Sequence, residues 1–458
     1  MKKQFGFLML MMFVLLLVAC SNDSDTAGES MEDIEVVSEI EGTVRVALAG
    51  FQLEDGIDPI TAVENKGMET FIEEQFKPRY PNIEIELTQV PWENAQAKQT
   101  AMLQSGDADV LYTGGAFATQ WYQQGLLRDL DDLIEEDEDF DSSIYLTGVW
   151  ENSYSVRSAD GEHQFGIPAI LGRRVISYDK QLFDEWGVDY LSDNPTPAEV
   201  LEKAAQMTGE NPETGEMNYG LWFDGKSLNL STFVALTHAF GATGGEGTLD
   251  DPKNIEWNLN SPEMVEVFEW LEEAAQYPPS DFLNAQGNEN YGLESNNIGI
   301  FLDNDGSTVM AELRANDNEE LAERYEATLN LGPDGEGWVA VDPYVMAKNA
   351  ENVEASWEVL KFFTGYEAQK FNYEEYTNTP TLAEADFVSD QDIYMAKAAE
   401  IAEVSTSTLM DEANPFFGSE MAPAVNGFVS EAHNGETPDI QAYLDDLQER
   451  AERWSANQ

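Results

Sequence analysis

The chain has 458 residues, of which 88 are Asp or Glu and only 23 are Lys or Arg, so its formal charge is −65 at pH 7. This balance argues against nucleic-acid binding, because phosphate contacts need Lys and Arg side chains. The hydrophobic (42%) and aromatic (11%) contents are those of a globular protein with apolar cores. Because the charge repels itself and salt screens that repulsion, we expect an acidic, exported protein adapted to saline or alkaline surroundings.

The N-terminal segment has the pattern of an export signal. Lys2 and Lys3 precede an apolar run from Phe5 to Val18, followed by Ala19 and by Cys20, the only cysteine of the chain. The run is too short for a comfortable membrane span. A small residue directly before a cysteine resembles the lipobox of bacterial lipoproteins, in which the signal is removed and the cysteine carries lipid. We therefore expect a signal peptide over residues 1–19 and a lipid anchor at Cys20, outside the cytoplasmic membrane.

The alternative for this segment is an ordinary secretory signal with an incidental cysteine. With a lipobox, residues 20–42 are expected to form a lipidated, disordered acidic tether, because few large apolar residues occur there. No cysteine follows, which leaves no intrachain disulfide and no thiolate metal site. His163, His238 and His433 are far apart and show no ligand spacing, so the sequence predicts no metal and no cofactor.

Strands and helices alternate in the next part of the chain. Apolar runs and period-two alternation predict strands, while apolar residues at helical spacing predict helices. This order is typical of an α/β domain with a largely parallel sheet. The predicted elements are a strand at 43–49, a helix at 67–76, a strand at 83–87, a helix at 94–103 and a strand at 109–112.

Three later helices have clear start signals. Thr196-Pro197-Ala198-Glu199 is a capping box with proline at the first helical position. Ser261-Pro262 and Thr437-Pro438 predict two further starts. The apolar stripes that follow are interpreted as core faces rather than membrane-binding faces.

Seven short segments carry a resemblance to a known family. In order, they resemble segments of the extracellular solute-binding proteins of ABC importers, in the carbohydrate-binding, maltose-binding-protein-like branch. Ala108 stands where the family usually has proline, and Asp179 where it usually has asparagine. The segments are residues 76–85, 102–110, 125–130, 165–168 with 175–180, 196–199, 355–364 and 378–381.

The resemblance implies a two-lobe α/β fold of the periplasmic-binding-protein type II, with crossing segments between the lobes and the ligand in the cleft. The implied first lobe comprises residues 43–168 plus 296–341, and the second comprises 172–295 plus 346–458. Ligands of parallel α/β sheets do sit beyond the carboxyl ends of strands. Hinge closure around the ligand would supply the conformational signal.

A sugar site needs carboxylates and amides for the hydroxyl groups, and flat aromatic rings for the apolar sugar face. An aromatic residue in this chain is otherwise interpreted as core. Asp303-Asn304-Asp305-Gly306 has its glycine two positions too early for an EF-hand loop, so no metal is expected there. The predicted ligand-binding residues are Trp92, Gly114, Arg173, Tyr178, Trp222, Asp224, Asp303, Trp338 and Tyr344.

Arg173 and Arg174 stand together at the first predicted crossing, in a chain with few basic residues. One of them could bind a ligand carboxylate in two contacts, which would indicate an acidic sugar such as a uronate. The alternative, which we favour, is an ion pair between the lobes.

The resemblance implies a non-enzymatic, monomeric substrate-binding component that captures a sugar or oligosaccharide and delivers it to ABC permease subunits. Two alternatives remain open. The ligand could be another solute, such as a peptide, a polyamine or an osmolyte. The chain could instead be an exported carbohydrate-active enzyme that uses two carboxylates, although no nucleophile motif or catalytic histidine cluster occurs in it.

Overall fold

The computed structural model describes residues 36–57, 64–226, 230–316 and 318–458. The predicted signal peptide, Cys20 and the first part of the predicted tether lie outside these residues. The tether was expected to extend to residue 42, but Val37 donates its N–H to the carbonyl oxygen of Arg79 (2.8 Å). Val37 and Ile40 also pack against a hydrophobic core. Within the described ranges, no helix combines the length and the apolar character needed to cross a membrane.

The first sheet has five strands in the order β4-β1-β5-β14-β6. The three predicted strands lie side by side in it, with β1 parallel to both of its neighbours. The later strand β14 runs antiparallel to β5 and β6, so the sheet is mixed rather than largely parallel. The strands are β1 (Gly42–Ala49), β4 (Ile83–Val90), β5 (Val110–Tyr112), β6 (Gly166–Leu171) and β14 (Val341–Met346).

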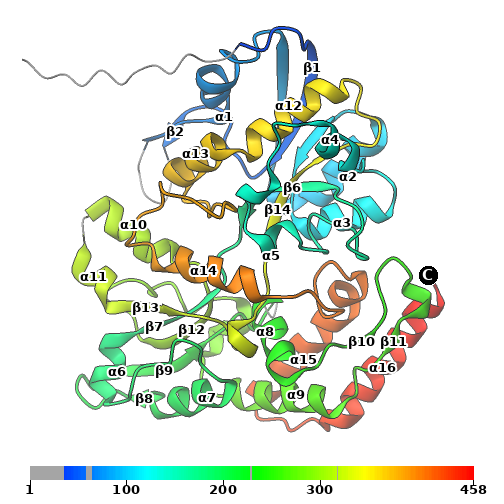
Figure 1. The fold of residues 1–458 in the computed structure, drawn as a ribbon. Helices are drawn as coiled ribbons and strands as arrows, with labels where there is room; N and C mark the ends of the chain where they lie inside the picture. Colours follow the sequence, from blue (N-terminus) through cyan, green and yellow to red (C-terminus); the bar gives the residue numbers. More distant parts are fainter. Residues whose placement is uncertain (1–35, 58–63, 227–229, 317) are drawn as a thin grey trace, which may run out of the picture. The chain divides into compact units, whose positions relative to one another are not determined.

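Helices from distant parts of the chain cover this sheet. Helix α12 contacts β1, β5, β6 and β14, and α13 packs on α12 (Figure 1). Their apolar side chains join the core of the first sheet. The helices of this part are α1 (Met68–Phe71) with a π turn (Ile72–Phe76), α2 (Ala95–Ser105), α3 (Gly115–Gln123), α4 (Asp131–Glu136), α5 (Thr147–Trp150), α12 (Val353–Thr364) and α13 (Tyr366–Tyr376).

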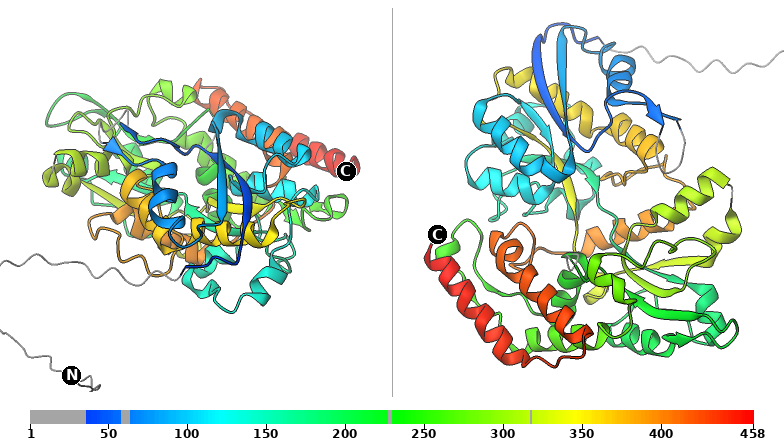
Figure 2. Two further views of the ribbon diagram at one scale, coloured as in Figure 1. Left: turned by 90° about the horizontal axis from the view of Figure 1, so that it is seen from above. Right: turned by 180° about the vertical axis from the view of Figure 1, so that it is seen from behind.

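The second sheet has the order β13-β7-β12-β9-β8, with β12 parallel to β9 and antiparallel to β7. Helices α15 and α16 both pack on α9, and the view from behind shows them together (Figure 2). The strands are β7 (Val175–Asp179), β8 (Gly209–Glu210), β9 (Met217–Trp222), β12 (Ile298–Asn304) and β13 (Tyr325–Thr328). The helices are α6 (Lys180–Trp186), α7 (Pro197–Gln206), α8 (Leu230–Phe240), α9 (Pro262–Ala274), α10 (Ser307–Asn316), α11 (Glu319–Arg324), α14 (Ile393–Val404), α15 (Ala422–His433) and α16 (Ile440–Ala456).

Two-stranded ribbons are β2 (Gly56–Ile57) with β3 (Glu64–Asn65), and β10 (Gly245–Glu246) with β11 (Glu256–Trp257).

The helix starts follow their sequence signals with small differences. The Thr196 hydroxyl accepts the N–H of Glu199 (3.1 Å), as a capping box requires. The Glu199 carboxylate, however, accepts from Ser192 rather than from the cap residue. The last helix begins two residues later than predicted, because Asp439 caps it by accepting the N–H of Ala442.

The two sheets divide the chain differently from the predicted lobes. The prediction placed 296–341 in the first lobe and 346–458 in the second. Strand β12 instead pairs with β7 and β9 of the second sheet, while helices α12 and α13 cover the first. Every residue of β12 is buried, and burial alone does not indicate which sheet a strand joins.

The chain passes between the two sheets at residues 172–174, 329–340 and 377–392. Hydrogen bonds tie these crossing segments together. Gly172 donates its N–H to the Ala340 carbonyl oxygen (2.7 Å), and Leu171 donates to that of Thr379 (3.0 Å). A Cβ atom on Gly172 would lie 2.7 Å from the Cβ of Ala340, so the close approach of two crossings requires glycine there.

Candidate ligand-binding site

Polar and aromatic side chains meet at one edge of the first sheet. Trp92 lies two residues beyond the end of β4, and Tyr112 ends β5. Asp342 lies near the start of β14, which reaches the same edge because β14 is antiparallel to β5. The Tyr112 hydroxyl donates to Oδ2 of Asp342 (3.1 Å). The Cβ position of Gly114, the residue before α3, lies 3.8 Å from both Asp342 Oδ1 and Cζ3 of Trp92.

Trp92 is a large aromatic residue with 44% of its surface exposed at this edge. A Cβ atom on Gly50 would lie 2.0 Å from the indole Nε1, and Gly50 has φ +76°. Only glycine tolerates both the positive φ and the close approach of the indole, so Gly50 leaves the space that the indole occupies. The Tyr112 ring meets the indole edge-on at 6.0 Å. The arrangement suits stacking against a flat apolar surface.

The second sheet and the crossings contribute a charged group. Asp303 near the end of β12 is buried and holds φ +66°, a backbone conformation that non-glycine residues rarely adopt. Its Oδ1 lies 3.5 Å from Nε of Arg174, and the guanidinium group lies 5.8 Å from the ring centre of Trp338. Asn330 donates to the Arg174 carbonyl oxygen and so holds this crossing in place.

Two adjacent carboxylates after α14, Asp411 and Glu412, complete the site. Burial raises the pKa of Glu412 to about 8, helped by the charges of Asp411 and Asp342 and opposed by Arg174. Burial likewise raises the pKa of Asp342 to about 6, although Tyr112 and Arg174 favour its charged form. Burial also raises the pKa of Asp411 to about 6. Asp303, Asp342, Asp411, Glu412 and Arg174 are called the carboxylate–arginine cluster below.

Four predicted ligand-binding residues, Trp92, Gly114, Asp303 and Trp338, therefore lie in or beside the carboxylate–arginine cluster. The other five lie elsewhere. Arg173 is buried and pairs with Asp392 (3.2 Å), an arrangement that corresponds to the ion-pair alternative. Tyr344 is fully buried and stacks on Phe363, so it belongs to the core.

The remaining three predicted residues have local roles in the second sheet. Tyr178 is buried against Phe183. The indole of Trp222 donates to the Gln286 carbonyl oxygen (3.1 Å). Asp224 accepts the N–H of Lys226 in a turn (2.8 Å).

Sequence reasoning missed Asp342, Asp411 and Glu412. A carboxylate inside the apolar strand 341–346 is one signal that could have found Asp342, because charged side chains rarely lie in such strands. Asp411 and Glu412 give no comparable signal, since acidic residues occur throughout this chain.

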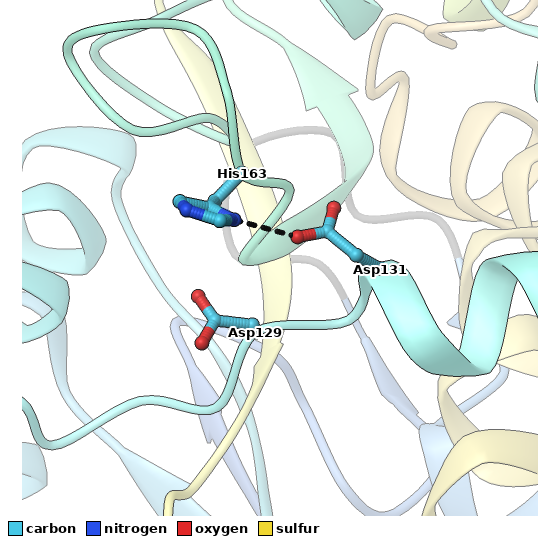
Figure 3. Close-up of side chains that lie close together, drawn as sticks. All are labelled: Asp129, Asp131 and His163. Atoms are coloured by element: carbon cyan, nitrogen blue, oxygen red, sulfur yellow. Dashed lines mark hydrogen bonds and ion pairs between the residues drawn. The ribbon is translucent and has the colours of Figure 1, made fainter.

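A second cluster consists of Asp129, Asp131 at the start of α4, and His163 in the segment before β6 (Figure 3). His163 Nδ1 is 2.9 Å from Asp131 Oδ2, and this contact raises the pKa of His163. Tyr122 donates to Asp129, and the N–H of Gln164 donates to Asp131. The three groups offer ligand atoms within 4.8 Å of one another, which their sequence spacing does not indicate. Their ion pair and hydrogen bonds account for the arrangement.

A comparison with known protein families identifies the class of this protein. Residues 61–370 match the family described as bacterial extracellular solute-binding protein. The chain belongs to this family, as the sequence resemblance implied.

Solved structures share the fold at low sequence identity. The sugar-binding protein MalE of Xanthomonas citri is 16% identical with a TM-score of 0.67, over 91% of this chain and 98% of that one. An ABC substrate-binding protein of Listeria monocytogenes, solved with cycloalternan, is 17% identical with a TM-score of 0.65, over 90% and 99%. A solute-binding protein of Agrobacterium vitis, solved with D-mannitol, is 20% identical with a TM-score of 0.62, over 91% and 98%. The α/β fold with two sheets is thus that of the two-lobe solute-binding proteins.

Proposed function

We propose that this protein is the substrate-binding component of an ABC importer and captures a sugar, oligosaccharide or polyol for its permease subunits. Family membership supports the transport role. The observation that carries the choice of ligand is the meeting of exposed Trp92 with the carboxylate–arginine cluster at the strand ends. An aromatic face and several hydrogen-bonding groups are what a polyhydroxylated ring or chain requires. Relatives solved with cycloalternan, D-mannitol and ribitol bind ligands of this chemistry.

The protein acts by closing its site around the ligand. The ligand binds unchanged, and the tied crossings 172–174, 329–340 and 377–392 act as the hinge on which the site closes. The protein works as a monomer on the outer face of the cytoplasmic membrane, held by lipid on Cys20. Cell fractionation tests the anchor: Cys20→Ala should move the protein from the membrane to the soluble fraction, and unchanged membrane retention would contradict it.

Trp92→Ala tests the site. We expect it to weaken the binding of whichever sugar or polyol shifts the melting temperature of the wild type, by roughly tenfold or more, because a large aromatic contact is lost. Isothermal titration of the mature chain carrying Cys20→Ser, at high salt, measures this.

Tyr190→Ala is the matched control. Tyr190 is 43% exposed, close to the value for Trp92, and its ring packs on Phe183 of α6. It should leave affinity unchanged. Equal losses in both variants, or no loss in Trp92→Ala, would contradict the assignment of the site.

A further inference from the structure

The carboxylate–arginine cluster contains more negative than positive groups. It holds four carboxylates and one guanidinium, and that guanidinium already lies beside Asp303. In the described part of the chain, Arg174 is the only cation that favours the charged forms of Asp342 and Glu412. Charged groups away from water are costly unless a partner of opposite charge compensates them.

Two of the carboxylates also have oxygens to which no described residue donates a hydrogen bond. Asp411 is more than nine-tenths buried, and Oδ1 accepts only the N–H of Ala413 in its own turn (3.0 Å). Among the residues that the structure describes, nothing donates to its other oxygen or to Glu412. Glu412 is partly exposed, so its oxygens and the second oxygen of Asp411 remain available to accept hydrogen bonds from a ligand.

We propose that the cargo of this site carries a protonated amine, as an amino sugar or an amino polyol does. The ammonium group meets Asp411, Glu412 and Asp342, while the carbon skeleton stacks on Trp92. Aromatic faces such as Trp92 and Trp338 also attract cations. This inference rests on the proposed function and makes it narrower. It excludes the uronate considered for the arginine pair, because Arg173 is occupied by Asp392 and an acidic ligand would meet four carboxylates.

Matched ligands test the inference without changing the protein. One pair is glucosamine and N-acetylglucosamine, and the other is their β-1,4-linked disaccharides. The two members of each pair share a skeleton and differ in the charged amine. Isothermal titration at high salt and pH 6.5 should give at least tenfold tighter binding for the amine in one of these pairs. Titration in two buffers of different ionisation enthalpy should show that the amine displaces protons from the cluster and that the acetylated form does not.

Glu412→Gln provides the matched variant, since it keeps the shape and removes the charge. We expect it to weaken amine binding by roughly tenfold and to abolish the preference for the amine over its acetylated counterpart. Glu266→Gln, an exposed glutamate of α9, is the control and should change neither. The melting temperatures of both variants verify that they fold, and Asp342→Asn supplies a second test should Glu412→Gln not fold.

The possible outcomes distinguish a failure of the amine inference from a failure of the proposed function. Preferential binding of the amine, lost in Glu412→Gln, supports the inference. Equal or tighter binding of acetylated or neutral sugars overturns it and leaves the proposed function standing. Failure of every sugar and polyol to bind overturns both.

Discussion

At the scale of single residues, the carboxylate–arginine cluster keeps Glu412 in an environment where its neutral form is favoured. Its pKa is raised from an ordinary value near 4.5 to about 8 by burial and by Asp411 and Asp342. A group whose pKa is higher in the folded than in the unfolded state stabilises the fold fully below its unfolded pKa. That stability is lost as the pH rises through the folded pKa.

The ligand-free protein should therefore lose stability relative to Glu412→Gln between pH 5 and pH 8.5. Glutamine cannot ionise, so the variant behaves like the protonated wild type throughout. The measurement is the melting temperature of both proteins across this range at constant high salt. Parallel curves for the two proteins would show that Glu412 titrates normally.

At the scale of secondary-structure elements, a buried ion pair joins β1 to β5. The Asp109 carboxylate, 1% exposed, accepts from Nε (2.9 Å) and Nη2 (2.7 Å) of Arg45. It also accepts the backbone N–H groups of Arg45 and Glu351, so it links the two strands to the turn before α12. Burial alone would raise the pKa of Asp109, but these hydrogen bonds lower it overall.

Arg45→Met should destabilise the protein by about 3–5 kcal/mol, because it leaves a buried carboxylate unpaired. Denaturant unfolding at pH 7 and fixed salt measures the change. Arg453→Met removes the exposed pair with Glu449 (3.4 Å) and serves as the comparison, with an expected cost below about 1 kcal/mol. Similar costs for the two substitutions would contradict the role given to the Arg45–Asp109 pair.

Element-level patterns in the sequence predicted three strands of the first sheet, although not its mixed strand directions. Strands 43–49, 83–87 and 109–112 and the starts after Thr196 and Ser261 follow from local periodicity and capping, which act within a few residues. The sheet that β12 joins depends on pairing between distant segments, and no local pattern encodes it. Trp92 and Asp303 could be placed because they lie at or just beyond the ends of strands that local patterns predict. Asp411 and Glu412 lie in a loop that only the folded chain brings to the strand ends.

At the scale of the whole molecule, the net charge dominates. The formal charge is −65, and cleavage at the proposed signal site would remove Lys2 and Lys3 and make it about −67. Such a charge weakens a compact fold at low ionic strength, and at 1 M salt the Debye length is only about 3 Å.

The melting temperature should therefore rise by several degrees or more between low salt and molar NaCl. Repeating the comparison with sucrose at equal osmolality separates screening from general solvent effects, since sucrose carries no charge. A melting temperature that is the same at low and molar salt would contradict adaptation of this surface to saline conditions.

The proposed function requires that this protein binds a sugar or polyol and releases it unchanged. The decisive measurement is isothermal titration of the mature chain carrying Cys20→Ser at high salt, followed by chromatographic recovery of the ligand. The ligands are amino, neutral and acidic sugars, polyols, betaines and peptides. We expect saturable one-to-one binding of a sugar or polyol that is recovered intact. Binding only of a peptide or betaine, or conversion of the sugar to products, would contradict it.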